Sequence, residues 1–214
     1  MDAAILQDRI SRGLGTAARR IGASTDAYRP RGTSDPLARA NRFLRLPAAF
    51  SGPDGKFARP NGYGDALWFG VFDAAYTRPG DYLVQGGSIW FVAAQQPLLP
   101  VLCVQTNRTV AFRRPAAPGG VGVNSYGGIA LSTATPLISG WPASVLGASP
   151  GNRPSANLPS DSSVGTWTVL LPAVEDVVLR PADLMTDDLD RTGIVASAEI
   201  TDLGWRLTVK QAST

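Results

Sequence analysis

Residues 78–113 read RPGDYLVQGGSIWFVAAQQPLLPVLCVQTNRTVAFR, and this stretch decides the fold class. Together with the segment before it, the stretch contains five short apolar runs separated by turn signals, at 66–75, 82–84, 89–94, 101–106 and 109–113. Such runs predict strands, and Gly86-Gly87 between two of them predicts a hairpin. So many short strands in so few residues are typical of a small β-barrel or sandwich.

The composition of the whole chain agrees with a mainly β protein and argues against an enzyme. The 214 residues include 23 glycines and 17 prolines, which predict many turns, but no histidine and one cysteine. Without histidine, Ser-His and Cys-His catalysis and imidazole-metal sites are excluded. Cys103 lies in an apolar run and reads as a small buried hydrophobe. We therefore expect no catalytic residues, no metal and no cofactor.

Residues 1–22 are expected to form a docking helix. Leu6, Ile10, Leu14, Ala17 and Ile21 recur at helical spacing and form an apolar stripe. The arginines at positions 9, 12, 19 and 20 fall on the other side. The stripe could pack on the helix's own domain or on a neighbouring subunit, and the sequence leaves both readings open.

Residues 23–65 are expected to form a long extended arm. Five prolines interrupt this segment, and it has no clear strand or helix period. Its hydrophobic residues, among them Phe43, Leu46, Phe50 and Phe57, are too many for a free linker. We therefore expect the arm to lie on protein surface, and specifically on another subunit.

Residues 66–214 are expected to form the β domain, possibly as two similar modules at 66–114 and 166–214. A loop-rich insertion, with long Gly-, Pro- and Ser-rich loops, would occupy 115–165. The evidence for two modules is a weak repeat: the stretch from Arg180 to Met185 matches the stretch from Arg78 to Leu83, and further strand runs follow each at similar spacing.

The acidic segment 187–199 fits the pattern of a calcium loop, with carboxylates at Asp188, Asp190 and Glu199 and a glycine at position 193. Its flanks predict strands, whereas an EF-hand needs helices. The favoured interpretation is an acidic hairpin turn, and calcium binding is the alternative.

Charge is unevenly spread along the chain. Residues 1–59 carry 11 basic and 5 acidic groups, whereas residues 115–214 carry 5 basic and 9 acidic groups. Opposite charge at the two ends is suited to head-to-tail contacts between copies. No apolar stretch approaches the ~20 residues that span a bilayer, and no signal peptide is evident. We expect synthesis in the cytoplasm and no membrane partner.

Several stretches resemble proteins encoded among the head and neck structural genes of tailed bacteriophages and prophages. They are 42–50, 59–64, 67–68, 72–73, 79–83, 97–100 with 107–108, 141–144 and 201–207. The resemblance covers the chain from about residue 5 onward. It implies a head-tail connector, collar or stopper protein of the virion, assembled in the host cytoplasm.

The function that the resemblance implies is a hexameric or dodecameric ring at the head-tail interface. The ring would contact the portal or an adaptor on one side and tail proteins on the other, and double-stranded DNA would pass through it without sequence-specific contacts. The expected subunit-interface residues come from the helix, the arm and one loop tryptophan: Leu6, Arg9, Ile10, Arg12, Leu14, Arg19, Arg20, Phe43, Leu46, Phe50, Phe57 and Trp141.

Two other functions remain open at this point. A carbohydrate- or receptor-binding β module of the tail would present exposed aromatic residues in a concave patch. A DNA-binding protein would use the arginine-bearing helix, and its affinity would fall steeply with salt.

Overall fold

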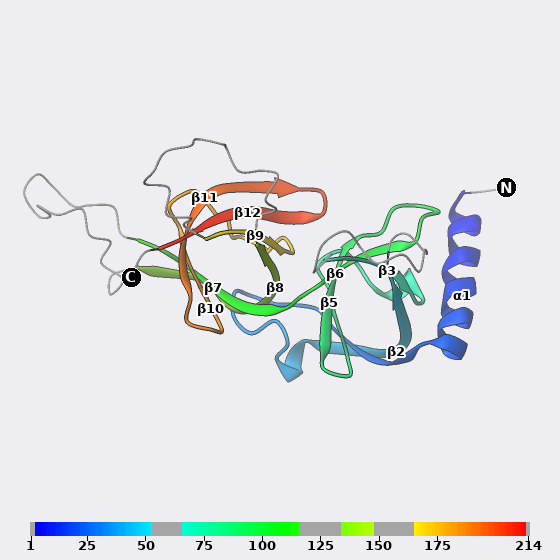
Figure 1. Ribbon diagram of the computed structural model, residues 1–214. Coiled ribbons are helices and arrows are strands. Elements are labelled where there is room, and N and C mark those ends of the chain that lie inside the picture. Colours follow the sequence, from blue (N-terminus) through cyan, green and yellow to red (C-terminus); the bar gives the residue numbers. More distant parts are fainter. Residues whose placement is uncertain (1–2, 53–65, 116–133, 148–164, 213–214) are drawn as a thin grey trace, which may run out of the picture.

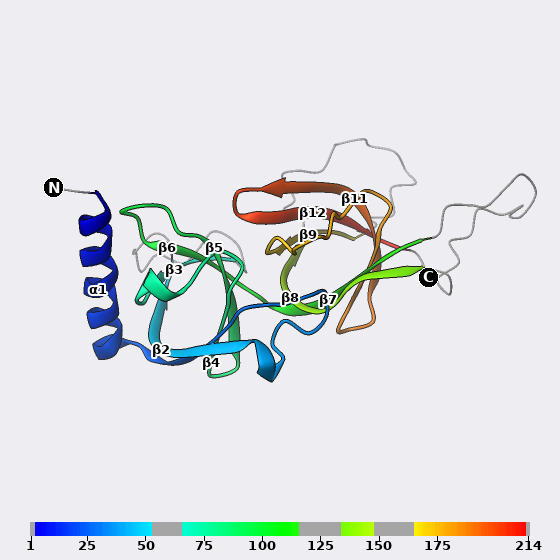
Figure 2. The same cartoon turned by 180° about the vertical axis from the view of Figure 1, so that it is seen from behind.

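The computed structural model of the protein describes residues 3–52, 66–115, 134–147 and 165–212. They form two closed six-stranded barrels side by side, with one helix, α1 (Ala3–Ile21), at the outer end of the first barrel (Figure 1). The view from behind shows the same order of parts (Figure 2). The predicted mainly β barrel core with an N-terminal helix is therefore confirmed.

The first barrel is built from β1 (Ala23–Tyr28), β2 (Arg42–Ser51), β3 (Leu67–Val71), β4 (Tyr82–Gln85), β5 (Ser88–Ala94) and β6 (Val101–Gln105). The second is built from β7 (Arg108–Arg114), β8 (Thr135–Gly147), β9 (Thr166–Leu171), β10 (Leu184–Asp187), β11 (Thr192–Thr201) and β12 (Gly204–Gln211). Two short 3₁₀ turns, η1 (Arg39–Asn41) and η2 (Ala74–Tyr76), lie in the first half.

The two barrels have the same topology. Around the first barrel the strands run β1-β2-β3-β6-β5-β4, and around the second β7-β8-β9-β12-β11-β10, with every neighbouring pair antiparallel. Strand β7 therefore occupies the place of β1, β8 the place of β2, and so on to β12, which occupies the place of β6. Closing each sheet removes its exposed edges.

An Arg–Asp corner repeats in both barrels. Arg29 follows β1 and donates to both carboxylate oxygens of Asp81, at 2.9 and 2.8 Å. Arg114 ends β7 and donates in the same way to Asp183, at 2.8 and 2.9 Å. In each corner the aspartate also accepts the backbone N–H of the arginine three residues before it. The two corners are the RPGD and RPAD of the sequence repeat, now at equivalent places.

The module boundaries expected from the sequence are wrong. The first barrel begins at β1 and ends at β6, so it needs residues 23–28 and 42–51 from the supposed arm. The second begins at β7, so 108–114 belong to it and not to the first. The repeat at 180–209 is only the second half of a barrel, because a six-stranded sheet closes only when its first three strands are included.

The expected extended arm is likewise wrong for the described part of residues 23–65. Strand β1 pairs with both β2 and β4, which closes the first barrel within the chain. Its sequence, ASTDAY, points the small residues Thr25 and Ala27 inward, so no large hydrophobic residue signals the strand period. Pro47 lies inside β2, where proline normally argues against a strand.

The barrels share one hydrophobic core at their contact. Strand β5 is apolar on both faces: Trp90 and Val92 pack inside the first barrel, whereas Phe91 and Ala93 pack with the second barrel's core. This explains the unbroken apolar run from Ile89 to Ala94, which is typical of a strand covered on both sides.

Tyr82 joins the two barrels directly. Its hydroxyl donates to the carbonyl oxygen of Pro142 in β8 at 2.7 Å, and its ring meets those of Phe91 and Trp141 edge-on. The hydroxyl is completely buried, and burial raises the pKa of Tyr82 well above its ordinary value. The barrel contact therefore combines a buried hydrogen bond with aromatic packing, as inside a single domain.

Candidate assembly surface

Helix α1 packs on the first barrel through small residues. Ser11 and Ala18 are buried on this face, and Gly15 lies between them against Asp73 of the turn before η2. A Cβ added to Gly15 would lie 2.9 Å from the Asp73 Cβ, and one added to Gly22 would lie 2.6 Å from the Ala48 carbonyl oxygen. The sequence-based prediction missed this face because it followed large hydrophobic residues.

The predicted apolar stripe of α1 is exposed only at its two ends. Successive residues of an α-helix are rotated by about 100° around its axis. On this helical wheel, the centre of the apolar stripe lies about 100° from the centre of the small-residue face. Leu6 is 36% exposed and Ile21 is 69% exposed, while Ile10, Leu14 and Ala17 are half-buried. The helix thus exposes two apolar side chains of the stripe, Leu6 and Ile21, at one end of the molecule.

The arginines of α1 remain at the surface. Arg12 pairs with Asp8 one turn earlier, at 2.8 Å, and both side chains are exposed. Arg9, Arg19 and Arg20 are exposed and form no ion pair with any described residue. On the helical wheel Arg9 and Arg20 border the apolar stripe on the side away from the barrel.

Three predicted arm residues lie within the chain's own first barrel. Leu46 is buried in its core, and Phe50 stacks on Trp90 with ring centroids 4.0 Å apart. Phe43 is partly exposed and its ring lies 4.4 Å from the Arg29 guanidinium. As inter-subunit contacts of an arm, the predictions for Leu46 and Phe50 are wrong, because the barrel core needs these two residues. Phe43 is outside the core, and its subunit contact stays a prediction. Phe57 lies outside the described residues.

Trp141 anchors an interface, but within the chain and not between subunits. It is 2% exposed, and its indole N–H donates to the Thr33 carbonyl oxygen at 2.9 Å. The segment around Thr33 also pairs with Ser139, which ties the β1–β2 connection to β8. The assignment of Trp141 to a subunit contact is therefore corrected. The other four tryptophans are buried or half-buried, in line with the prediction that they belong to the core.

An apolar groove opens between the two barrels. Its volume is about 290 Å³, and its apolar lining comes from both barrels: Phe69, Ala94, Leu99, Pro100, Leu102 and Leu203. Asp202, in the β11–β12 turn, stands at its rim. Sequence reasoning missed the groove, because its lining combines strand ends and turns from residues 69 to 203.

Charge in the described residues follows the long axis of the molecule. Helix α1 and the first barrel carry ten basic and five acidic residues, whereas the second barrel carries seven basic and eight acidic residues. Helix α1 itself, at one end of the molecule (Figure 1), carries four arginines and one aspartate. The uneven charge distribution of the sequence is thus also a spatial one.

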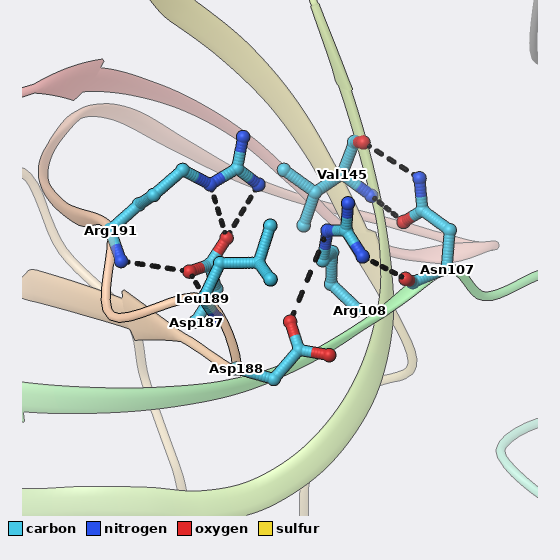
Figure 3. Close-up of polar contacts among 7 residues, drawn as sticks. All are labelled: Asn107, Arg108, Val145, Asp187, Asp188, Leu189 and Arg191. Atoms are coloured by element: carbon cyan, nitrogen blue, oxygen red, sulfur yellow. Dashed lines mark hydrogen bonds and ion pairs between the residues drawn. The ribbon is translucent and has the colours of Figure 1, made fainter.

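The β10–β11 turn is closed by a buried carboxylate (Figure 3). Asp187 accepts hydrogen bonds from the backbone N–H groups of Leu189 and Arg191 and from the Arg191 guanidinium. Burial acts to raise the pKa of Asp187, but these hydrogen bonds outweigh it, and the pKa lies below its ordinary value. A carboxylate bonded in this way holds a turn and has little capacity left for proton transfer.

Asn107 joins the first barrel's last strand to the second barrel (Figure 3). Its side-chain amide donates to the Val145 carbonyl oxygen at 2.9 Å and accepts the Val145 N–H at 2.8 Å. Its own N–H donates to the Ala143 carbonyl oxygen at 3.0 Å. The connection between the barrels is thus bound along β8, and the barrels are held in one orientation.

The alternative of a calcium loop at 187–199 is wrong as an EF-hand. Asp188 lies 3.9 Å from Arg108, while Glu199 pairs with Arg206 near the far end of β11. A strand rises about 3.3 Å per residue, so the seven steps from Thr192 to Glu199 place Glu199 about 23 Å along β11 from the turn that bears Asp188. In the described residues no three metal-ligating side chains of the His, Cys, Asp and Glu types gather.

The described residues show little else that bears on chemistry. Cys103 is buried inside the first barrel, and burial raises the pKa of its thiol, which makes it unreactive. Of the described helices, none has the length and apolar character needed to cross a lipid bilayer. No protein-family model, curated protein or solved structure matches the chain.

Proposed function

We propose that the protein is a structural subunit of a tailed-phage virion, which assembles into a ring at the head-tail interface through which DNA passes. The observation that carries this proposal is that α1, at one end of a two-barrel body, leaves Leu6 and Ile21 of its apolar stripe exposed next to four surface arginines. The sequence resemblance to phage head and neck proteins supplies the place in the virion.

The shape of the subunit supports a ring of identical copies. Rings need heterologous contacts, in which one end of a subunit meets a different surface of the next. A basic end and a more acidic barrel provide electrostatic complementarity for such a contact. Because the two barrels share one core, the helix end and the second barrel keep a fixed relative orientation. The same contact repeated between identical copies can then close into a ring.

The partners proposed for the ring are a portal or adaptor on the head side and tail proteins on the other. Duplex DNA would pass the ring without sequence-specific contacts. The carbohydrate- or receptor-binding alternative requires a platform of exposed aromatics. All five tryptophans are buried or half-buried, and the exposed aromatics of the described residues are Phe43 and Tyr76 alone. We therefore do not propose it.

The ring is tested by native mass spectrometry and electron microscopy of the full chain. We expect hexamers or dodecamers that are lost in the double variant Leu6→Glu with Ile21→Glu, because charge then occupies the apolar stripe. The matched control is Ile5→Glu, which changes an equally apolar residue, 51% exposed, on the other side of the helix. A chain that stays monomeric up to about 1 mM would contradict the proposal.

A further inference from the structure

We propose that the groove between the two barrels holds helix α1 of a neighbouring copy of this chain. This inference rests on the proposed function and names the contact by which one subunit of the ring meets the next. It joins a mostly apolar groove that has Asp202 in its lining to a helix stripe that has exposed ends, Leu6 and Ile21, and arginines along one side.

The groove has the character of a helix-binding site more than of a small-molecule site. Its volume of about 290 Å³ lies at the lower limit of ligand pockets, which occupy about 300–1,000 Å³. It is partly open to solvent, and its lining is apolar except for Gln96 and Asp202. An amphipathic helix enters such a groove through residues at i, i+4 and i+7. Ile10, Leu14 and Ala17 have this spacing, and Leu6 and Ile21 extend it.

The chain's own helix is held away from this groove. Gly15 and Gly22 bring α1 into close contact with Asp73 and Ala48 at the outer end of the first barrel. The Gln7 side chain accepts the Leu98 N–H at 2.7 Å, which ties the helix to the β5–β6 loop. The groove lies on the second-barrel side of this loop, so the helix that fills it comes from a second copy.

Charge favours the same pairing. Asp202 at the groove rim forms no ion pair with any described residue, and neither do Glu175 and Asp176. The turn bearing these two follows β9, whose last residue pairs with Trp205 next to the β11–β12 turn. Arg9 and Arg20 border the apolar stripe and are also unpaired among the described residues. Docking would bring the two sets of unpaired charges together.

This contact would form a ring instead of a closed dimer. The helix and the groove are different surfaces of one subunit, so a copy that gives its helix to one neighbour keeps its groove for another. Repetition of the contact generates a ring when the rotation closes.

Disulfide trapping between two differently tagged chains tests the contact. One chain carries Leu6→Cys or Ile21→Cys on the stripe, and the other carries Leu99→Cys in the groove. Cys103 is buried and does not interfere. We expect a mixed disulfide from at least one stripe position. We expect none from the control Ile5→Cys, nor with Leu98→Cys, which changes an exposed leucine of the same loop outside the groove lining.

A second measurement separates failure of this contact from failure of the ring. We expect Leu99→Glu to weaken assembly at least about tenfold, whereas Leu98→Glu leaves it unchanged. Rings that form equally well with Leu99→Glu and give no mixed disulfide would overturn the groove contact and leave the ring proposal intact. A wild-type chain that never assembles would overturn both. A single chain can also carry both the stripe cysteine and the groove cysteine. If it forms only an internal disulfide and no mixed product appears, the groove is filled by the chain's own helix, which would overturn the contact between copies.

Discussion

Three buried aspartates, Asp81, Asp183 and Asp187, each hold a turn closed through an arginine. In every case the carboxylate also accepts backbone N–H groups, so its oxygens are satisfied within the chain. Charged hydrogen bonds of this kind are stronger than neutral ones. These three buried carboxylates therefore have a structural role.

The Asp187 turn predicts a pH dependence of stability. Because the folded-state pKa of Asp187 is lowered, its contribution is present above its ordinary pKa of about 3.9 and is lost as pH falls through the folded-state value. We expect Asp187→Asn to reduce the free energy of unfolding at pH 7 by about 1–3 kcal/mol. As the pH is lowered, the variant should lose less of its free energy of unfolding than the wild type does.

Urea unfolding at a series of pH values measures this effect. The control is Asp190→Asn, in the same turn, whose side chain is exposed and unpaired among the described residues, with an expected change within about 0.5 kcal/mol. Equal losses for the two variants would contradict the role of the Asp187 carboxylate.

Among the elements, α1 shows how one helix can have two different faces. Small residues bring it against the first barrel, and larger apolar residues lie to one side. Two glycines in the helix test this arrangement, since both weaken a helix but only one of them touches the barrel.

We expect Gly13→Ala to stabilise the protein by about 0.5–1 kcal/mol, because alanine favours the helix and a Cβ there meets nothing within 4 Å. Gly15→Ala has the same helix preference but places its Cβ 2.9 Å from the Asp73 Cβ, so we expect a lower melting temperature than wild type. Thermal unfolding followed by circular dichroism compares the two. A Gly15→Ala variant as stable as Gly13→Ala would contradict the close packing.

For the whole molecule, the barrels are expected to unfold as one unit. Tyr82, Phe91 and Ala93 of the first barrel belong to the core cluster of the second, so neither barrel can open without exposing apolar surface of the other. Calorimetry should show one transition, with equal calorimetric and van't Hoff enthalpies. Two separate transitions would contradict this.

Tyr82→Phe should lower the melting temperature of that single transition. It removes the hydroxyl that donates to the Pro142 carbonyl oxygen, a change worth about 1 kcal/mol. Tyr76→Phe is the control, because Tyr76 is exposed, at 63%, and its hydroxyl has no hydrogen-bond partner among the described residues. The same scan measures both variants.

Local patterns in the sequence determined the strands that follow turn signals, the N-terminal helix and the repeated RPGD and RPAD corners. These features depend on residues that are neighbours along the chain, which is why periodicity and turn chemistry reveal them. For the same reason, the tryptophans at 68, 90, 167 and 205 could be placed in the core.

Barrel closure was decided only in three dimensions, because β1 carries small inward residues and β2 contains Pro47, and their pairing partners lie far along the chain. The burial of Trp141 between the barrels likewise depends on contacts with Thr33 and Tyr82. The groove and the face by which α1 packs arise from shape and close approach, which hydrophobic periodicity does not encode. Residues distant in sequence thus decided both the closure of the barrels and which surfaces stay exposed.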